Sequence, residues 1–203
     1  KTTLEASGMV FEQSSAVARA QFSLLRDKLE LLLQLEYATK NVKELVVLDL
    51  GDNHEGDSLR VSQATKVDAP VTVQCIETTD LITEFVTWAL TRFPKVRYLK
   101  VGGNHDRISQ KPGTAGLGEL SMIDTFAWLQ GEFLRRLFGK SIEDGRLSLT
   151  NHESWFGAAH IAGQRFVYEH GASFRASTGC VDPSTEILTA DGWKKHDQLI
   201  EGE

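Results

Sequence analysis

The chain has 203 residues, of which 41% are hydrophobic and 25% charged, a composition typical of a globular protein of one domain or one and a half that buries a sizeable core. Its formal net charge of −6 excludes the overall basic surface that drives nucleic-acid affinity, although a nucleic-acid substrate stays open because bound metal ions supply local positive charge. The sequence has no signal-peptide pattern, no bilayer-spanning apolar run and only two cysteines, Cys75 and Cys180, which indicates a reducing, cytoplasmic setting and no membrane partner.

The first quarter of the chain predicts a helix followed by a buried strand. Residues 1–13 are polar and irregular, so we expect no regular element there. From residue 15 to about residue 39, apolar side chains recur at three- and four-residue spacing, which predicts an amphipathic helix whose apolar stripe packs into the core. The aliphatic run at 45–50 then predicts a strand, which ends at Gly51-Asp52.

A second helix and a second strand repeat this order. Residues 81–93 show a helical apolar pattern that Pro94 ends, since proline cannot continue the backbone hydrogen-bond ladder. Residues 96–101 predict a buried strand, which leads into Gly103-Asn104-His105-Asp106. Ligands of open α/β sheets bind at the carboxyl ends of strands, and glycines let the chain turn sharply there. We therefore expect these polar side chains and that of Asp52 to point into one crevice.

This set of side chains suits hydrolysis at two divalent metal ions. Asp52 can place one oxygen on each ion, and the amide oxygen of Asn104 adds a neutral ligand that does not over-neutralise the pair. The imidazole of His105 can protonate a leaving alkoxide if Asp106 holds its ring in place.

Two arginines are candidate contacts for a substrate phosphate. Arg60 lies in the loop after Asp52, and Arg107 follows Asp106 directly. A planar guanidinium matches a phosphate well. For Arg60 the preferred interpretation is a solvated loop residue, and for Arg107 an ordinary ion-pair partner is a nearly equal alternative to the phosphate contact.

The second half of the chain predicts one more helix and then strands. Residues 122–138 carry a helical apolar pattern, and short apolar runs between 146 and 170 predict a second sheet. The last of these runs ends at His170-Gly171, so that a strand is again followed by a polar side chain and a glycine, as in the earlier motifs. His170 is therefore a candidate metal ligand. His152 and His160 have no such context and are interpreted as structural.

Gly51-Asp52, Gly103-Asn104-His105-Asp106 and His170-Gly171 resemble the second, third and fourth motifs of the calcineurin-like metallophosphoesterases. The resemblance covers residues 1–179. It implies an α/β (α+β) fold with a two-sheet core flanked by helices, two divalent metal ions (Mn²⁺ first, Fe or Zn²⁺ as alternatives) and phosphomonoester or phosphodiester substrates, nucleic acid included. It also implies that Asp52 bridges the ions, that Asn104 and His170 are metal ligands, and that Asp106 orients the proton donor His105.

Two motifs of this family are missing. No Gly-x-His-x-His occurs, and Asp-x-His occurs once, as Asp52-Asn53-His54, where it overlaps the Gly-Asp motif. Read as the opening motif, it would make His54 a ligand but leave no later Gly-Asp after a strand. We therefore prefer the second-motif interpretation, in which Asp52 is still a ligand and His54 is a loop residue. We expect the opening motif a few residues before Lys1.

Residues 180–203 change character. Cys180, the Thr-x-Ile-x-Thr stretch at 185–189 and Asp191-Gly192 at a predicted hairpin turn resemble the opening block of an intein. The resemblance implies that the Cys180 thiolate attacks the carbonyl of Gly179 to form a thioester, with a complementary intein and extein part as partner. The missing Gly-x-His-x-His would then lie in the downstream extein.

Three alternatives stay open beside this interpretation. Cys180 can be a buried structural thiol. The chain can be a complete, divergent phosphoesterase without splicing, with Asp52 and His54 as ligands of the first metal. It can also be a metal-free binding protein on the same fold.

Overall fold

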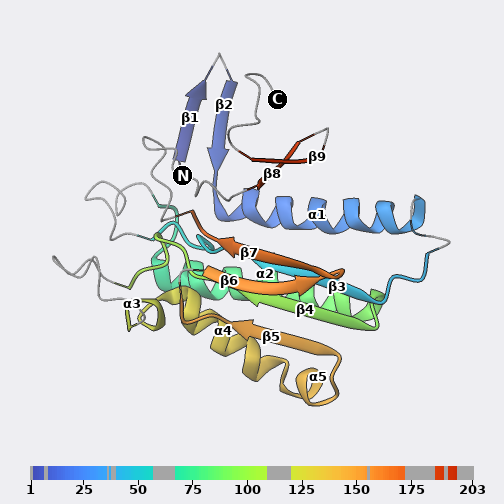
Figure 1. Ribbon diagram of the computed structural model, residues 1–203. Coiled ribbons are helices and arrows are strands. Elements are labelled where there is room, and N and C mark those ends of the chain that lie inside the picture. The colour runs from blue at the N-terminus through green and yellow to red at the C-terminus, as the bar shows by residue number, and fades with distance from the viewer. Residues whose placement is uncertain are drawn as a thin grey trace. The chain divides into compact units, whose positions relative to one another are not determined.

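The computed structural model describes residues 2–6, 9–35, 37, 40–56, 67–108, 120–154, 156–171, 186–189 and 192–195 (Figure 1). The chain forms two compact units, Lys1–His170 and Gly171–Glu203, and each is considered by itself. The first unit combines helices with a parallel sheet and antiparallel hairpins, which confirms the predicted α/β class. None of the helices in the described ranges has the length and apolar character needed to cross a membrane.

A three-stranded parallel sheet lies at the centre of the first unit. Its strands are β3 (Glu44–Asp49), β4 (Lys95–Lys100) and β5 (Leu147–Asn151), in the order β3-β4-β5. Both pairings are parallel, and Asp49 lies opposite Lys100. The loops after β3 and β4 therefore leave the sheet at the same edge, as the sequence predicted. The two predicted strands are displaced by one residue from the observed ones.

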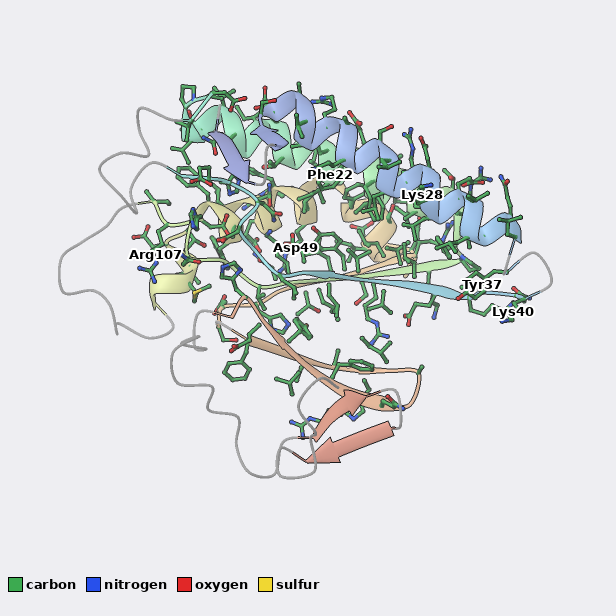
Figure 2. All side chains as sticks on the ribbon, turned by 90° about the horizontal axis from the view of Figure 1, so that it is seen from above. Phe22, Lys28, Tyr37, Lys40, Asp49 and Arg107 are labelled. Atoms are coloured by element: carbon green, nitrogen blue, oxygen red, sulfur yellow. The ribbon has the colours of Figure 1, made fainter. Side chains whose placement is uncertain are left out.

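Helices cover one face of this sheet (Figure 2). Two of them, α2 (Val71–Arg92) and α4 (Phe126–Leu137), provide most of the buried side chains, while the short helices α3 (Leu120–Ile123) and α5 (Gly139–Glu143) flank α4 in the chain. Alternate residues of β4 point into this layer. The buried cluster consists of Ile82, Val86, Ala89, Phe93, Val96, Tyr98, Leu134, Phe138 and Leu147.

The helix α1 (Ser15–Leu35) packs less tightly than its sequence predicted. Phe22 and Leu33 lie against the buried cluster, yet no residue of α1 is fully buried. Leu24 and Leu35 are 56% and 72% exposed. The expectation that its whole apolar stripe packs into the core is therefore wrong.

A hairpin covers the opposite face of the parallel sheet (Figure 2). It consists of β6 (Phe156–Ile161) and β7 (Gln164–Glu169), which pair antiparallel. Tyr168 is buried with Leu99 and Val101 of the sheet, and Ala159 and Val46 pack around them. The predicted second sheet is therefore present, although β5, from the same stretch of sequence, joins the parallel sheet instead.

Three local predictions differ from the structure. Residues 1–13, expected to be irregular, form the antiparallel strands β1 (Thr2–Ala6) and β2 (Met9–Gln13), which satisfy each other's backbone groups. The helix predicted from residue 81 begins ten residues earlier, at Val71. The helix predicted over 122–138 breaks at Thr125, whose side chain accepts a hydrogen bond from the Trp128 nitrogen and so caps α4.

In the second unit, β8 (Glu186–Thr189) and β9 (Gly192–Lys195) form an antiparallel hairpin. Thr189 lies opposite Gly192, so the chain reverses between them. This confirms the hairpin predicted at Asp191-Gly192, although residues 190–191 lie outside the described ranges.

Candidate functional site

Three side chains predicted from separate motifs meet at one edge of the parallel sheet. Asp52 follows β3, Asn104 follows β4 and His170 follows β7. The Nε2 atom of His170 lies 2.8 Å from Oδ1 of Asn104 and 3.0 Å from Oδ2 of Asp52. Two oxygens and one imidazole nitrogen, from three loops, therefore converge within hydrogen-bond distance.

The backbone explains how the first two loops approach so closely. Gly51 has φ +81° and Asp52 has φ +53°, both in the left-handed region. A Cβ atom on Gly51 would overlap the backbone nitrogen of Gly103, and one on Gly103 would overlap the carboxylate of Asp52. The loops thus touch backbone to backbone, which a larger side chain at either glycine would prevent.

The ring of His170 faces more acceptors than a neutral imidazole can satisfy. Its Nδ1 atom lies 2.8 Å from the carbonyl oxygen of Leu50, and Nε2 faces the oxygens of Asp52 and Asn104. A neutral imidazole has one N–H. If it donates to Leu50, the Nε2 lone pair points at two other oxygens. The lone pair of Nε2 and these two oxygens thus face one another, an arrangement that a metal ion between them would satisfy.

As a metal shell this donor set is incomplete. In the described part of the chain, no group of three or more His, Cys, Asp and Glu side chains is placed to hold a metal ion. Asp52 and His170 supply two such ligands, and the third donor is an amide. The set fits a divalent cation chemically, because carboxylate, amide oxygen and imidazole are all ordinary ligands of Mn²⁺ and Zn²⁺.

Asp106 does not orient His105, so this prediction is wrong. The carboxylate of Asp106 is fully buried. Its Oδ2 accepts hydrogen bonds from the backbone nitrogens of Asp52 and Gly103, at 2.9 and 2.7 Å, and its Oδ1 lies 2.7 Å from Nδ1 of His54. Both carboxylate oxygens of Asp106 therefore contact groups other than His105.

His105 is held by other groups. Its backbone nitrogen donates to Oδ1 of Asp52 at 2.9 Å, and its ring Nδ1 lies 2.9 Å from the carbonyl oxygen of Glu55. A carbonyl oxygen only accepts, so the proton of this contact is on Nδ1 of His105. Glu55 thus takes the orienting position that the sequence assigned to Asp106.

His54 is buried beneath the site and has partners on both ring nitrogens. Its Nε2 lies 3.2 Å from Oγ1 of Thr78 on α2, and Nδ1 faces Asp106. Burial alone lowers the pKa of His54, but the Asp106 carboxylate and the Cys75 thiol raise the pKa above its usual value. His54 therefore faces the protein interior, whereas the donor atoms of Asp52, Asn104 and His170 face one another.

A second buried ion pair, between Lys100 and Asp49, lies next to the contact between Asp106 and His54. Burial raises the pKa of Asp106, but the hydrogen bond from His54 and the nearby charge of Lys100 lower the pKa below its usual value. Lys100 itself is 1% exposed, and its Nζ lies 2.7 Å from Oδ2 of Asp49. The hydroxyl of Tyr98 also donates to Asp49, at 2.6 Å.

Sequence reasoning missed this second pair because both residues lie inside predicted buried strands. Asp49 and Lys100 are the last residues of β3 and β4, and they lie opposite each other in the register. Opposite charges at matching ends of two apolar strands were the signal that could have found them.

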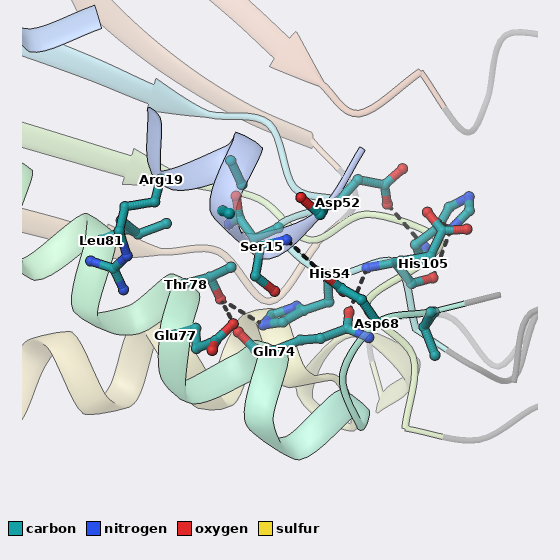
Figure 3. Close-up of a pocket in the computed structure, with 16 residues that line it drawn as sticks. Ser15, Arg19, Asp52, His54, Asp68, Gln74, Glu77, Thr78, Leu81 and His105 are labelled. Carbon is teal, nitrogen blue, oxygen red and sulfur yellow. Dashed lines mark hydrogen bonds and ion pairs between the residues drawn. The ribbon is translucent and has the colours of Figure 1, made fainter. Parts of the chain in front are cut away.

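A pocket of about 490 Å³ opens beside Asp52 and His105, between the first turn of α1 and α2 (Figure 3). Carboxylates dominate its charged lining, and its guanidinium, on Arg19, also contacts Glu84 at 3.4 Å. A phosphate ester bound here would therefore need an additional cation. The carboxylates are those of Asp52, Glu55, Asp68 and Glu77.

The remaining predicted site residues lie apart from this pocket or outside the described ranges. The backbone of Arg107 pairs with Thr125 in an isolated bridge, and Arg107 is not among the lining side chains. Arg60, Gly179 and Cys180 lie outside the described ranges. Comparison with family models, with curated proteins and with solved structures finds no match for this chain.

Proposed function

We propose that the first unit is the core of a metal-dependent phosphoesterase, a hydrolase acting on phosphodiesters or phosphomonoesters, with nucleic acid among the candidate substrates. The observation that carries the proposal is the convergence of Asp52, Asn104 and His170, of which Asp52 also lines an acidic pocket. These side chains come from three loops that are distant in sequence. A metal ion between their donor atoms would satisfy all three, and among the described lining residues of the pocket carboxylates outnumber the one guanidinium, that of Arg19.

In this proposal Asp52, Asn104 and His170 hold divalent cations, Mn²⁺ by preference and Fe or Zn²⁺ as alternatives. When bound, such ions neutralise the phosphate and lower the pKa of water so that it can attack. The carbonyl of Leu50 fixes Nδ1 of His170 and so directs Nε2 toward the other two ligands.

His105 is the proposed proton donor. It lines the pocket next to Asp52, and the Glu55 carbonyl fixes the Nδ1 side of its ring. Its Nε2, when it carries a proton as well, is the atom through which the ring would pass that proton to the leaving oxygen of the ester.

Alanine variants of the three ligands test the proposal. We expect the full chain to bind Mn²⁺, measured from the electron paramagnetic resonance signal of the free ion, and each of Asp52→Ala, Asn104→Ala and His170→Ala to weaken binding by at least about tenfold. His160→Ala removes an exposed histidine from β6 and should bind like the wild type. Wild-type protein without Mn²⁺ affinity, or ligand variants that bind normally, would contradict the proposal.

Hydrolysis by this chain alone should be weak even where Mn²⁺ binds. The family supplies further ligands from Asp-x-His and Gly-x-His-x-His motifs, and this sequence lacks the second and has no separate copy of the first. Rapid Mn²⁺-dependent cleavage of an aryl phosphodiester would show that the three ligands suffice.

We also propose that the second unit begins a protein-splicing element. The β8–β9 hairpin, which follows Cys180 within a unit of its own, supports this proposal. The Cys180 thiol would attack the Gly179 carbonyl, forming a thioester and freeing the Cys180 amine. With a complementary intein half and added thiol, we expect cleavage between Gly179 and Cys180, detected by mass spectrometry and absent in Cys180→Ala. An uncleaved wild-type chain would exclude splicing.

A further inference from the structure

His54 lies below the proposed ligands and has no contact with them, yet its side chain is 3% exposed and fully hydrogen-bonded. The hydroxyl of Thr78 donates to the carbonyl oxygen of Gln74 at 2.8 Å and accepts from Nε2 of Gln130 at 2.9 Å. Both ring nitrogens of His54 are thus engaged, Nε2 with Thr78 and Nδ1 with Asp106.

Asp106, which contacts His54, holds both strand-end loops. Oδ2 of Asp106 accepts from the backbone nitrogen of Asp52, in the loop after β3, and from that of Gly103, in the loop after β4. One buried oxygen atom thus joins the two loops. Its charge requires compensation, because a buried carboxylate without a partner is strongly disfavoured.

Asp52 depends on this connection. It has φ +53°, a left-handed conformation that residues with a Cβ adopt only occasionally and that the surrounding structure must hold. In this conformation its Oδ2 lies 3.0 Å from His170, and its Oδ1 accepts from the His105 nitrogen. A relaxed backbone at Asp52 would move the carboxylate away from both histidines.

We propose that His54 is a positioning residue: through Asp106 it fixes the left-handed backbone of Asp52 and so directs the Asp52 carboxylate toward His170. The inference rests on the proposed function where it concerns metal binding. The chain of contacts is continuous, from Thr78 on α2 through His54 and Asp106 to the Asp52 nitrogen. It explains why a histidine two residues after a ligand is turned into the protein instead of toward the site.

Two variants with amide side chains test the roles of Nδ1 and Nε2 of His54 separately. In His54→Asn the amide nitrogen takes the place of Nδ1 and can still donate to Asp106. In His54→Gln the longer side chain places its amide nitrogen near Nε2, where it can reach Thr78 but leaves Asp106 without this donor. Val86→Ala, which truncates a buried side chain of the same helix α2, controls for a general loss of stability.

Two measurements on the full chain are needed. The first is hydrogen exchange of the Asp52 and Gly103 amides by nuclear magnetic resonance without metal, and the second is Mn²⁺ affinity. We expect His54→Gln to lose protection at both amides and to bind Mn²⁺ about 10–100-fold more weakly, whereas His54→Asn and Val86→Ala stay close to the wild type.

Either of two results would overturn the inference. One is a folded His54→Gln variant with wild-type amide protection and Mn²⁺ affinity. The other is a His54→Asn variant that loses as much amide protection and Mn²⁺ affinity as His54→Gln. A wild-type chain that binds no Mn²⁺ would refute the proposed function instead, and the amide exchange would still decide the role of His54.

Discussion

Replacing Lys100 with methionine is expected to lower the free energy of unfolding by about 3–5 kcal/mol, because it leaves the Asp49 carboxylate buried without its counter-ion. Lys100 is 1% exposed and lies 2.7 Å from Asp49. Its charge also contributes to the lowered pKa of Asp106. Urea unfolding at neutral pH, followed by circular dichroism, measures the change.

A matched variant and a pH series control this result. Lys140→Met breaks an ion pair with Asp144 in which the lysine side chain is 79% exposed, and it should cost at most about 0.5 kcal/mol. Burial raises the pKa of Asp49, but Lys100 and Tyr98 lower the pKa below its usual 3.8. The stability from this pair is present above pH 3.8 and is lost as the pH falls through the folded-state pKa. The difference between wild type and Lys100→Met should therefore shrink in acid.

Gly51→Ala is the second substitution with a large expected effect, about 2–5 kcal/mol of unfolding free energy. About 1–2 kcal/mol comes from placing a Cβ at φ +81°, and about 1–3 kcal/mol comes from its overlap with the backbone of Gly103. Because the overlap pushes the loop after β3 away from the loop after β4, Mn²⁺ binding should be lost as well. Thermal unfolding and Mn²⁺ titration measure the two effects.

Gly163→Ala isolates the conformational part of this cost. Gly163, in the turn between β6 and β7, has φ +83°, and a Cβ there would meet nothing within 4 Å. The Gly163→Ala variant should lose only about 1–2 kcal/mol of unfolding free energy and retain Mn²⁺ affinity. Equal losses of unfolding free energy in Gly51→Ala and Gly163→Ala would mean that the contact between Gly51 and Gly103 does not constrain the loops.

Much of the fold could be predicted because its strands carry the clearest periodicity. The strands before Gly51 and Gly103 were placed within one residue, and their parallel pairing puts the two loops on one edge. The start of α2 was missed because its first turns bury polar side chains, Gln74 and Thr79 among them, in place of an apolar stripe.

The candidate site could be predicted at its surface but not beneath it. Asp52 and Asn104 each follow a strand and a glycine, and His170 directly follows β7, so all three lie at strand ends, where the sequence predicted them to converge. The pairing of Asp106 with His54 could not be predicted in this way, because adjacent residues at the end of a strand point in different directions. Sequence order suggested His105 as the partner of Asp106, whereas the fold turns Asp106 inward and His105 toward the pocket.

Anomalous diffraction from crystals grown with MnCl₂ tests the central claim most directly. The account predicts a manganese peak bounded by Oδ2 of Asp52, Oδ1 of Asn104 and Nε2 of His170, which move apart enough to admit the ion. A map without a peak at these three atoms, with His170 still hydrogen-bonded directly to Asp52 and Asn104, would contradict it.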